Sequence, residues 1–184
     1  MKKQSKMTGP TVLTIIRMVL SVAFLVFALL PEMWAKITAL SLFVVASITD
    51  NIDGRWARSK KITTDLGAFL DPLADKMLVD LAFLVLVYTN VVPLWMFAVI
   101  IVRDLAVDGM RMMAARDGVT IAASIFGKIK TTMQMIALIS ILANQIFDCQ
   151  MLAVVNTILL YIVVILTVYS GADYLIKGWK KVIK

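Results

Sequence analysis

Long apolar segments recur along this chain and restrict its fold more than any other feature of the sequence. A helix of about 20 apolar residues crosses a hydrocarbon core of roughly 30 Å, and a helix satisfies its backbone hydrogen bonds without help from water. The pattern therefore predicts an all-α, polytopic membrane protein with six transmembrane helices. The expected helices cover residues 12–30, 37 onward into 50–58, 64–67 to 89, 94–110, 125–146 and 151–176.

Composition agrees with a membrane protein and narrows its chemistry. Of the 184 residues, 61% are hydrophobic and 17% are charged, which is more apolar and less charged than a usual soluble domain. The chain has no histidine, so serine–histidine and cysteine–histidine mechanisms and histidine-ligated zinc are excluded. Its single cysteine, Cys149, excludes an intrachain disulfide. Carboxylates remain as the available acid–base groups and metal ligands.

The distribution of basic residues predicts the orientation of the chain in the membrane. The net charge is +7, and basic residues gather at the amino terminus, at residues 55–61, in an expected polar loop at 111–118 and at the carboxyl terminus. The positive-inside rule places these segments, and so both termini, in the cytoplasm. We attribute the positive charge to this topology and expect no nucleic-acid partner. Without a repeat or a separate soluble segment, residues 1–184 are expected to form a single membrane domain.

Four aspartates follow the second apolar stretch: Asp50, Asp53, Asp71 and Asp75. Helical spacing puts the first two on one face with Gly54 and Ala57, and the second two on one face with Gly67. Carboxylates at membrane depth are costly and usually mark a functional site with a partner cation. Oxygen ligands suit Mg²⁺ or Mn²⁺, so the two stripes predict a site for one or two metal ions. Spacing alone leaves open which carboxylate acts as a base.

The segment from Asp50 to Asp75 reads Asp-x2-Asp-Gly-x2-Ala-Arg-x8-Gly-x3-Asp-x3-Asp. It resembles the signature of the CDP-alcohol phosphatidyltransferases at every fixed position, and it is far more specific than a lone glycine-rich loop. The resemblance implies transfer of a phosphatidyl group from CDP-diacylglycerol to an alcohol, with release of CMP. It also implies a metal site, with two ions, formed by the four aspartates. Asp71 and Asp75 would be catalytic, and Asp75 is the favoured general base.

The same resemblance implies a donor site beside the carboxylates. Gly54, Ala57 and Gly67 would line the cytidine pocket, where small side chains let a nucleotide approach the helix backbone. Arg58 would pair with the donor phosphates, a role that suits a planar group with several donors. The alternative is that the glycines serve helix packing and that Arg58 only sets topology.

Four basic residues are candidates for the phosphate of an anionic acceptor: Arg103, Arg111, Lys128 and Lys130. Their pattern, with the opening Pro10-Thr11-x-Leu13-Thr14-x2-Arg17, resembles the bacterial phosphatidylglycerophosphate synthases, a branch of the family whose acceptor is sn-glycerol 3-phosphate. Thr11 stands where asparagine is more usual in the nucleotide site, and Asp104 where glutamate is more usual. Positive-inside charge and contact with anionic lipid are the alternative for the basic residues. Lys128 and Lys130 would point to different faces of a regular helix.

Other functions remain possible at the level of sequence. The same enzyme could use inositol phosphate, serine or phosphatidylglycerol as its acceptor, and helices with intramembrane carboxylates also describe a cation carrier. The fixed positions of Gly54, Ala57, Arg58 and Gly67 favour the enzyme, because ion transport requires no nucleotide pocket. The resemblance further implies a homodimer in the plasma membrane, with the active site on its cytoplasmic side.

Overall fold

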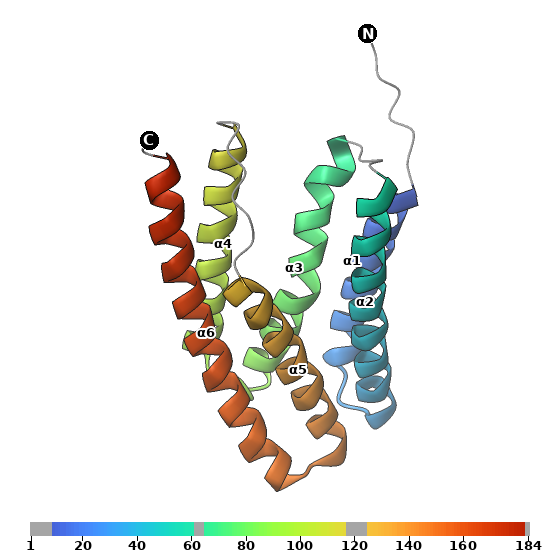
Figure 1. Ribbon diagram of the computed structural model, residues 1–184. Coiled ribbons are helices and arrows are strands. Elements are labelled where there is room, and N and C mark those ends of the chain that lie inside the picture. Colours follow the sequence, from blue (N-terminus) through green and yellow to red (C-terminus); the bar gives the residue numbers. More distant parts are fainter. Residues whose placement is uncertain (1–8, 61–64, 117–124, 183–184) are drawn as a thin grey trace. The chain divides into compact units, whose positions relative to one another are not determined.

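The computed structural model describes the backbone of residues 9–60, 65–116 and 125–182. Within these ranges, its description of side chains leaves out residues 9–11, 13, 50–72, 75, 115, 116 and 177–182. The described chain forms six helices and no strand (Figure 1). They are α1 (Gly9–Ala28), α2 (Met33–Lys60), α3 (Asp65–Tyr88), α4 (Leu94–Arg116), α5 (Ile125–Phe147) and α6 (Gln150–Val182).

The helices belong to two units, each with its own packing. The first unit contains α1, α2 and α3 as far as Val85, and the second runs from Leu86 to the end of α6 without Gln145–Phe147. The prediction of one domain over residues 1–184 stays a prediction.

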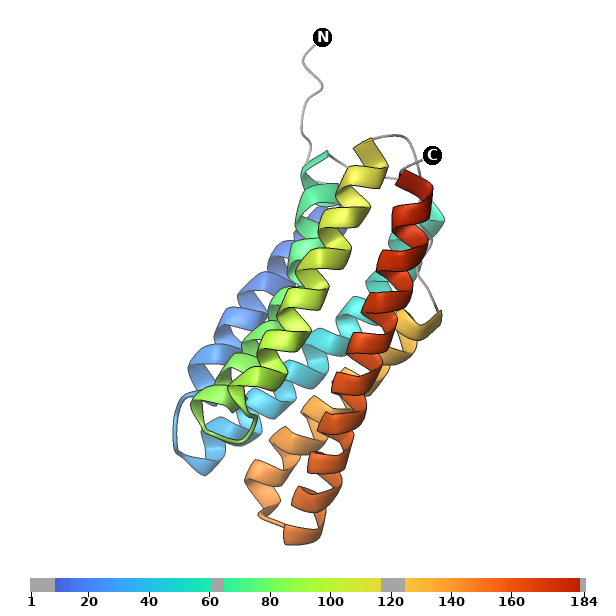
Figure 2. The ribbon, with the colours of Figure 1, turned by 90° about the vertical axis from the view of Figure 1, so that its left-hand side faces the viewer.

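In the first unit, α1 packs against α2 (Figure 1), and Figure 2 shows the two helices closest at the short turn that joins them. The rings of Phe24 and Phe43 lie 5.6 Å apart between their centroids, and both side chains are fully buried. On α1 the buried line also includes Thr14, Arg17 and Ser21, which repeat at helical spacing. The Arg17 side chain is therefore buried inside the protein.

In the second unit, α4 packs along α6, and α5 and α6 form an antiparallel hairpin (Figure 1). Asp148 closes this hairpin with a positive φ of 48°, and the amide of Cys149 donates to the Asn144 side chain. Across the hairpin the Ser140 hydroxyl donates to Asn156 at 2.5 Å. The Phe126 and Tyr169 rings meet edge to face, 4.9 Å apart. Polar and aromatic contacts thus hold α5 against α6.

Two of the described helical segments are long and apolar enough to cross a membrane, Ile125–Phe147 and Gln150–Ile176. Shorter apolar segments lie in α1 and α2, at Thr14–Ala28 and Met33–Thr49. The α6 segment exposes many large apolar side chains, and Met151 reaches 79% exposure. A continuous apolar surface of this kind is costly in water and suits contact with lipid. The fold and composition together indicate a membrane location.

The helix positions agree with most of the sequence predictions. The second helix continues through the aspartates to Lys60, and the fifth spans Ile125–Phe147, both as predicted. The expected loop at 111–118 was wrong in its first half, because α4 continues through Arg116. Residues 111–116 are arginine, methionine and alanine, which all favour helix. The loss of hydrophobicity at Arg111 therefore ends the apolar segment and not the helix.

Candidate active site

The aspartate motif lies at the end of one helix and the start of the next. Asp50 and Asp53 fall in the last three turns of α2, and Asp71 and Asp75 in the first three turns of α3. Only residues 61–64 separate these helices, and a chain of that length spans at most roughly 18 Å. The covalent structure thus limits the distance between the end of α2 and the start of α3, the two helices that carry the motif.

Buried residues lead up to the motif on both helices. On α2, Phe43, Ala46 and Ser47 are buried, and their helical spacing continues to Asp50. On α3, Ala74 and Leu78 are buried; the same spacing leads back to Asp71 and Gly67. The motif therefore occupies helix positions in line with packed faces, which is where a site inside a helical protein is built.

The motif side chains themselves lie outside the described residues, as does Thr11. Among the described side chains, no group of three or more carboxylates or cysteines is placed to hold a metal ion. The donor set of the motif, four carboxylates in a chain without histidine, fits a hard cation such as Mg²⁺ or Mn²⁺. The metal site and the donor pocket stay predictions.

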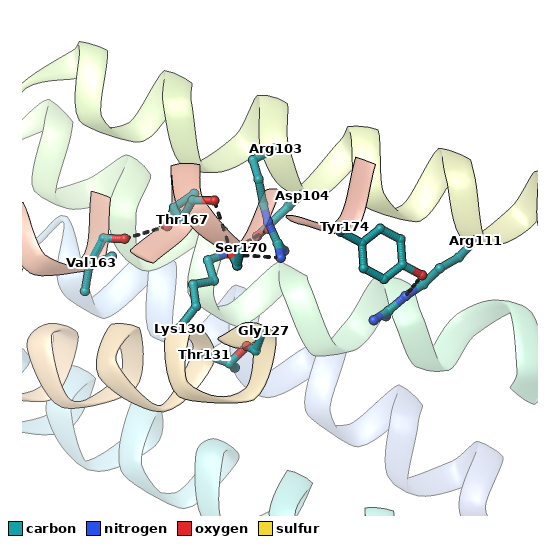
Figure 3. Close-up of polar contacts among 10 residues, drawn as sticks. All are labelled: Arg103, Asp104, Arg111, Gly127, Lys130, Thr131, Val163, Thr167, Ser170 and Tyr174. Carbon is teal, nitrogen blue, oxygen red and sulfur yellow. Dashed lines mark hydrogen bonds and ion pairs between the residues drawn. The ribbon is translucent and has the colours of Figure 1, made fainter. Parts of the chain in front are cut away.

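A second polar cluster lies in the other unit, where α4, α5 and α6 meet (Figure 3). Asp104 is 8% exposed and Lys130 only 2% exposed. The Lys130 ammonium donates to both carboxylate oxygens of Asp104, at 2.7 and 2.8 Å. Arg103 donates to the same carboxylate through Nη1 at 2.9 Å. One buried carboxylate thus holds two cations that come from different helices.

Ser170 on α6 provides a further contact to Arg103. The Arg103 Nη2 group donates to the Ser170 hydroxyl oxygen at 3.0 Å. That hydroxyl donates its own hydrogen to the backbone carbonyl of Thr167, at 3.2 Å. Because the hydrogen is engaged with the helix, the oxygen of Ser170 remains to accept from Arg103.

Arg111 lies two turns beyond Arg103 on α4 and meets a different residue of α6 (Figure 3). Its Nε group donates to the Tyr174 hydroxyl at 3.0 Å, and its guanidinium carbon lies 5.2 Å from the ring centroid. Tyr174 is 3% exposed and packs with Val107 and Met110, whereas Arg111 is exposed. The buried tyrosine therefore supports an arginine that remains accessible.

The two lysines of α5 differ in their surroundings. The helix begins at Ile125, so both lysines lie in regular helix. Lys130 is buried in the cluster and Lys128 is exposed. The prediction that they point to different faces is confirmed. Of the four predicted acceptor residues, the structure brings Arg103 and Lys130 together, places Arg111 further along α4 and leaves Lys128 on another face.

Sequence reasoning missed the contribution of α6. Ser170, Gly171 and Tyr174 follow Thr167 at spacings of three, four and seven, so the four residues share one helix face. Small and polar residues repeated on one face of an apolar helix are typical of helix contacts in membranes. This stripe was visible in the sequence, but nothing there indicated which helix it would meet.

The chain matches the family model described as CDP-alcohol phosphatidyltransferase over residues 7–169. It belongs to this family and is an enzyme of this class. The match includes the aspartate motif, Arg103, Asp104 and Lys130, and Ser170 is the first residue after it.

Several bacterial relatives share one name, CDP-diacylglycerol–glycerol-3-phosphate 3-phosphatidyltransferase. The relative from Bacillus subtilis is 37% identical over 184 residues, covering 93% of this chain and 95% of that protein. The relative from Yersinia enterocolitica is 38% identical, covering 95% and 97%. The relative from Sodalis glossinidius is 37% identical, covering 90% and 92%. The similarity therefore extends over nearly the whole of each protein.

Proposed function

We propose that this enzyme transfers the phosphatidyl group of CDP-diacylglycerol to sn-glycerol 3-phosphate, forming phosphatidylglycerophosphate and CMP in phospholipid biosynthesis. The observation that carries the proposal is the match along nearly the full length of relatives bearing that name. The polar cluster where α4, α5 and α6 meet also supports the proposal. An acceptor that carries a phosphate needs cationic residues to bind it, whereas a neutral alcohol does not.

In the proposed reaction the acceptor hydroxyl attacks the phosphorus that bears the diacylglycerol. A new oxygen–phosphorus bond forms, the bond to the CMP phosphate breaks, and CMP leaves with the bonding electrons. Asp75 accepts the proton of the attacking hydroxyl. Gly54, Ala57 and Gly67 admit the cytidine, and Arg58 pairs with the donor pyrophosphate.

The carboxylates of Asp50, Asp53, Asp71 and Asp75 would hold two Mg²⁺ or Mn²⁺ ions. When bound, the ions would supply charge stabilisation at the attacking and leaving oxygens of an in-line displacement. The all-oxygen donor set supports this assignment.

For the acceptor we propose Arg103 and Arg111 as the phosphate ligands. Arg111 is exposed while its position is held by Tyr174, and a guanidinium can bind a phosphate through two hydrogen bonds. Lys128, which is exposed on the other face of α5, would contact the acceptor phosphate or the anionic headgroups. Lys130 would act from inside the cluster, through Asp104.

We further propose a homodimer with six transmembrane helices, both termini in the cytoplasm and the active site facing the cytoplasm from the plasma membrane. The positive-inside distribution of basic residues supports the orientation. The acyl chains of CDP-diacylglycerol would then remain in the bilayer while its pyrophosphate reaches the aspartate motif.

Purified enzyme in detergent with Mg²⁺ or Mn²⁺ tests the acceptor. CMP release is measured with CDP-diacylglycerol and, in separate reactions, sn-glycerol 3-phosphate, inositol phosphate, serine and phosphatidylglycerol. We expect the highest kcat/KM with sn-glycerol 3-phosphate. Equal or faster turnover with another acceptor would reject this assignment while leaving the enzyme class intact.

Replacing Arg111 with alanine should raise the acceptor KM about tenfold and leave the donor KM within about twofold. The loss of one charge-assisted contact to phosphate has roughly this effect. Steady-state CMP release with each substrate varied in turn measures both constants. Lys36→Ala, which removes a cation near the start of α2, is the matched control and should change neither constant. A larger rise in the donor KM would reassign Arg111 to the nucleotide or the lipid.

A further inference from the structure

Arg103 makes contacts on several sides that the binding of a phosphate would not by itself require. Asp104 accepts from Nη1 and Ser170 accepts from Nη2. The aliphatic stem of Arg103 passes directly over Gly171, where an added Cβ would lie 2.8 Å from the Arg103 Cγ. No Cβ fits at that distance, so the stem occupies the space that any other residue at position 171 would need.

Lys130 is placed to hold Asp104 and not to meet a ligand. With 2% of its surface exposed, its ammonium directs two of its three hydrogens to the two oxygens of Asp104. This burial leaves little of the ammonium open to a phosphate. The carboxylate, fixed in this way from α5, presents Oδ1 to Arg103 on α4.

The guanidinium retains hydrogen-bonding capacity after these contacts. Arginine has five N–H groups, and within the described residues the structure gives Arg103 one partner on each terminal nitrogen. Its Nε is buried and has no hydrogen-bond partner in the described part of the chain. Arg103 and Lys130 share the Asp104 carboxylate, and a guanidinium with hydrogen-bonding capacity left suits a phosphate.

We propose that Ser170, Gly171 and Asp104 form a seat that fixes the Arg103 guanidinium for the phosphate of the acceptor, with Lys130 as the counter-ion that holds Asp104. Ser170, Gly171, Asp104 and Lys130 are positioning residues in this assignment, because they act through Arg103. The seat selects acceptors that carry a phosphomonoester over those that carry only hydroxyl groups. It rests on the proposed function and adds to it the residues that determine the acceptor class.

Gly171 offers a test that changes neither a charge nor a hydrogen-bonding group. Gly171→Ala should displace the Arg103 stem and raise the KM for sn-glycerol 3-phosphate about tenfold or more, since misplacement of a binding group by about 1 Å has effects up to 10²-fold. The KM for CDP-diacylglycerol should stay within about twofold. The preference for sn-glycerol 3-phosphate over glycerol, as a ratio of kcat/KM values, should fall by a similar factor.

Gly109→Ala is the matched control. It makes the same substitution within α4, where an added Cβ would have no atom within 4 Å. It should leave both KM values and the preference for the phosphorylated acceptor unchanged. An unchanged acceptor KM in Gly171→Ala, or an equal rise in the donor KM, would overturn the proposal that these residues fix Arg103 for the acceptor phosphate.

Ser170→Ala tests the same seat if Gly171→Ala does not fold, as judged by gel filtration and thermal unfolding in detergent. Loss of a hydrogen bond to a charged group should raise the acceptor KM about fivefold or more and again leave the donor KM unchanged. An unchanged acceptor KM would count against the seat. Failure of the proposed function is distinct, because wild-type enzyme would then turn over another acceptor faster than sn-glycerol 3-phosphate.

Discussion

Replacing Asp71 with asparagine should abolish phosphatidyl transfer, with a fall in kcat of at least about 10³-fold. The proposed metal ions supply several kcal/mol of transition-state stabilisation, and each 1.4 kcal/mol corresponds to tenfold in rate. Asparagine keeps the size of the side chain and removes the charge that binds the metal. CMP release over a range of Mg²⁺ and Mn²⁺ concentrations measures the loss.

Asp75→Asn should stop the reaction in a different way. Asp50, Asp53 and Asp71 would still be present to hold metal when the general base is lost, so CMP and CDP-diacylglycerol should still bind, as measured by calorimetry or by thermal stabilisation. Retention of most activity in Asp75→Asn would contradict its role as the base. Retention in Asp71→Asn would contradict its role as an essential metal ligand.

Asp148→Asn is the matched control for both aspartate substitutions. Asp148 is exposed in the turn between α5 and α6, where its φ is 48°. Asparagine accepts this left-handed conformation at least as well as aspartate. The control should therefore retain wild-type activity and stability.

Replacing Asp104 with asparagine should destabilise the folded enzyme by about 3–5 kcal/mol. The substitution removes the carboxylate that the buried Lys130 ammonium and the Arg103 guanidinium both contact, and breaking a buried ion pair by removing one partner has a cost of this size. Denaturant unfolding in mixed micelles, followed by far-UV circular dichroism, measures the change.

The double variant Asp104→Asn with Lys130→Met separates stability from acceptor binding. Removing both members of a buried ion pair is often close to neutral, so the double variant should recover most of the lost stability. The acceptor KM of the double variant should nevertheless be higher than that of the wild-type enzyme, because Arg103 has lost its contact to the carboxylate. Recovery of the wild-type acceptor KM along with stability would show that the pair has only a structural role. An Asp104→Asn variant as stable as wild type would contradict the predicted energetic cost.

Local patterns in the sequence were sufficient to predict most of the helix bounds. The continuation of α2 through Asp50 and Asp53 follows from unbroken helical spacing without proline, and the same spacing predicts that each pair of carboxylates shares a helix face. The end of α4 was placed too early, because a change in hydrophobicity marks a change of environment and not the end of a helix.

The seat around Arg103 could not be predicted in the same way. Arg103 and Ser170 are 67 residues apart, and Lys130 and Asp104 are 26 apart, so helical spacing says nothing about their contacts. The burial of Lys130 is likewise a tertiary property: on sequence it is one basic residue near a helix start, like its exposed neighbour Lys128. The proximity of Arg103 and Asp104 was visible in the sequence, but the serine and glycine that complete the arrangement were not.

The contribution of the last helix has a consequence for how the enzyme matures on the ribosome. Every residue of the aspartate motif precedes residue 76, whereas Arg103 receives its second hydrogen bond only from Ser170 on α6. A nascent chain arrested before α6 enters the membrane would carry the complete donor signature without a seated Arg103. On the proposed assignment, acceptor recognition would be the last property acquired during synthesis, after insertion of the segment that would bind CDP-diacylglycerol.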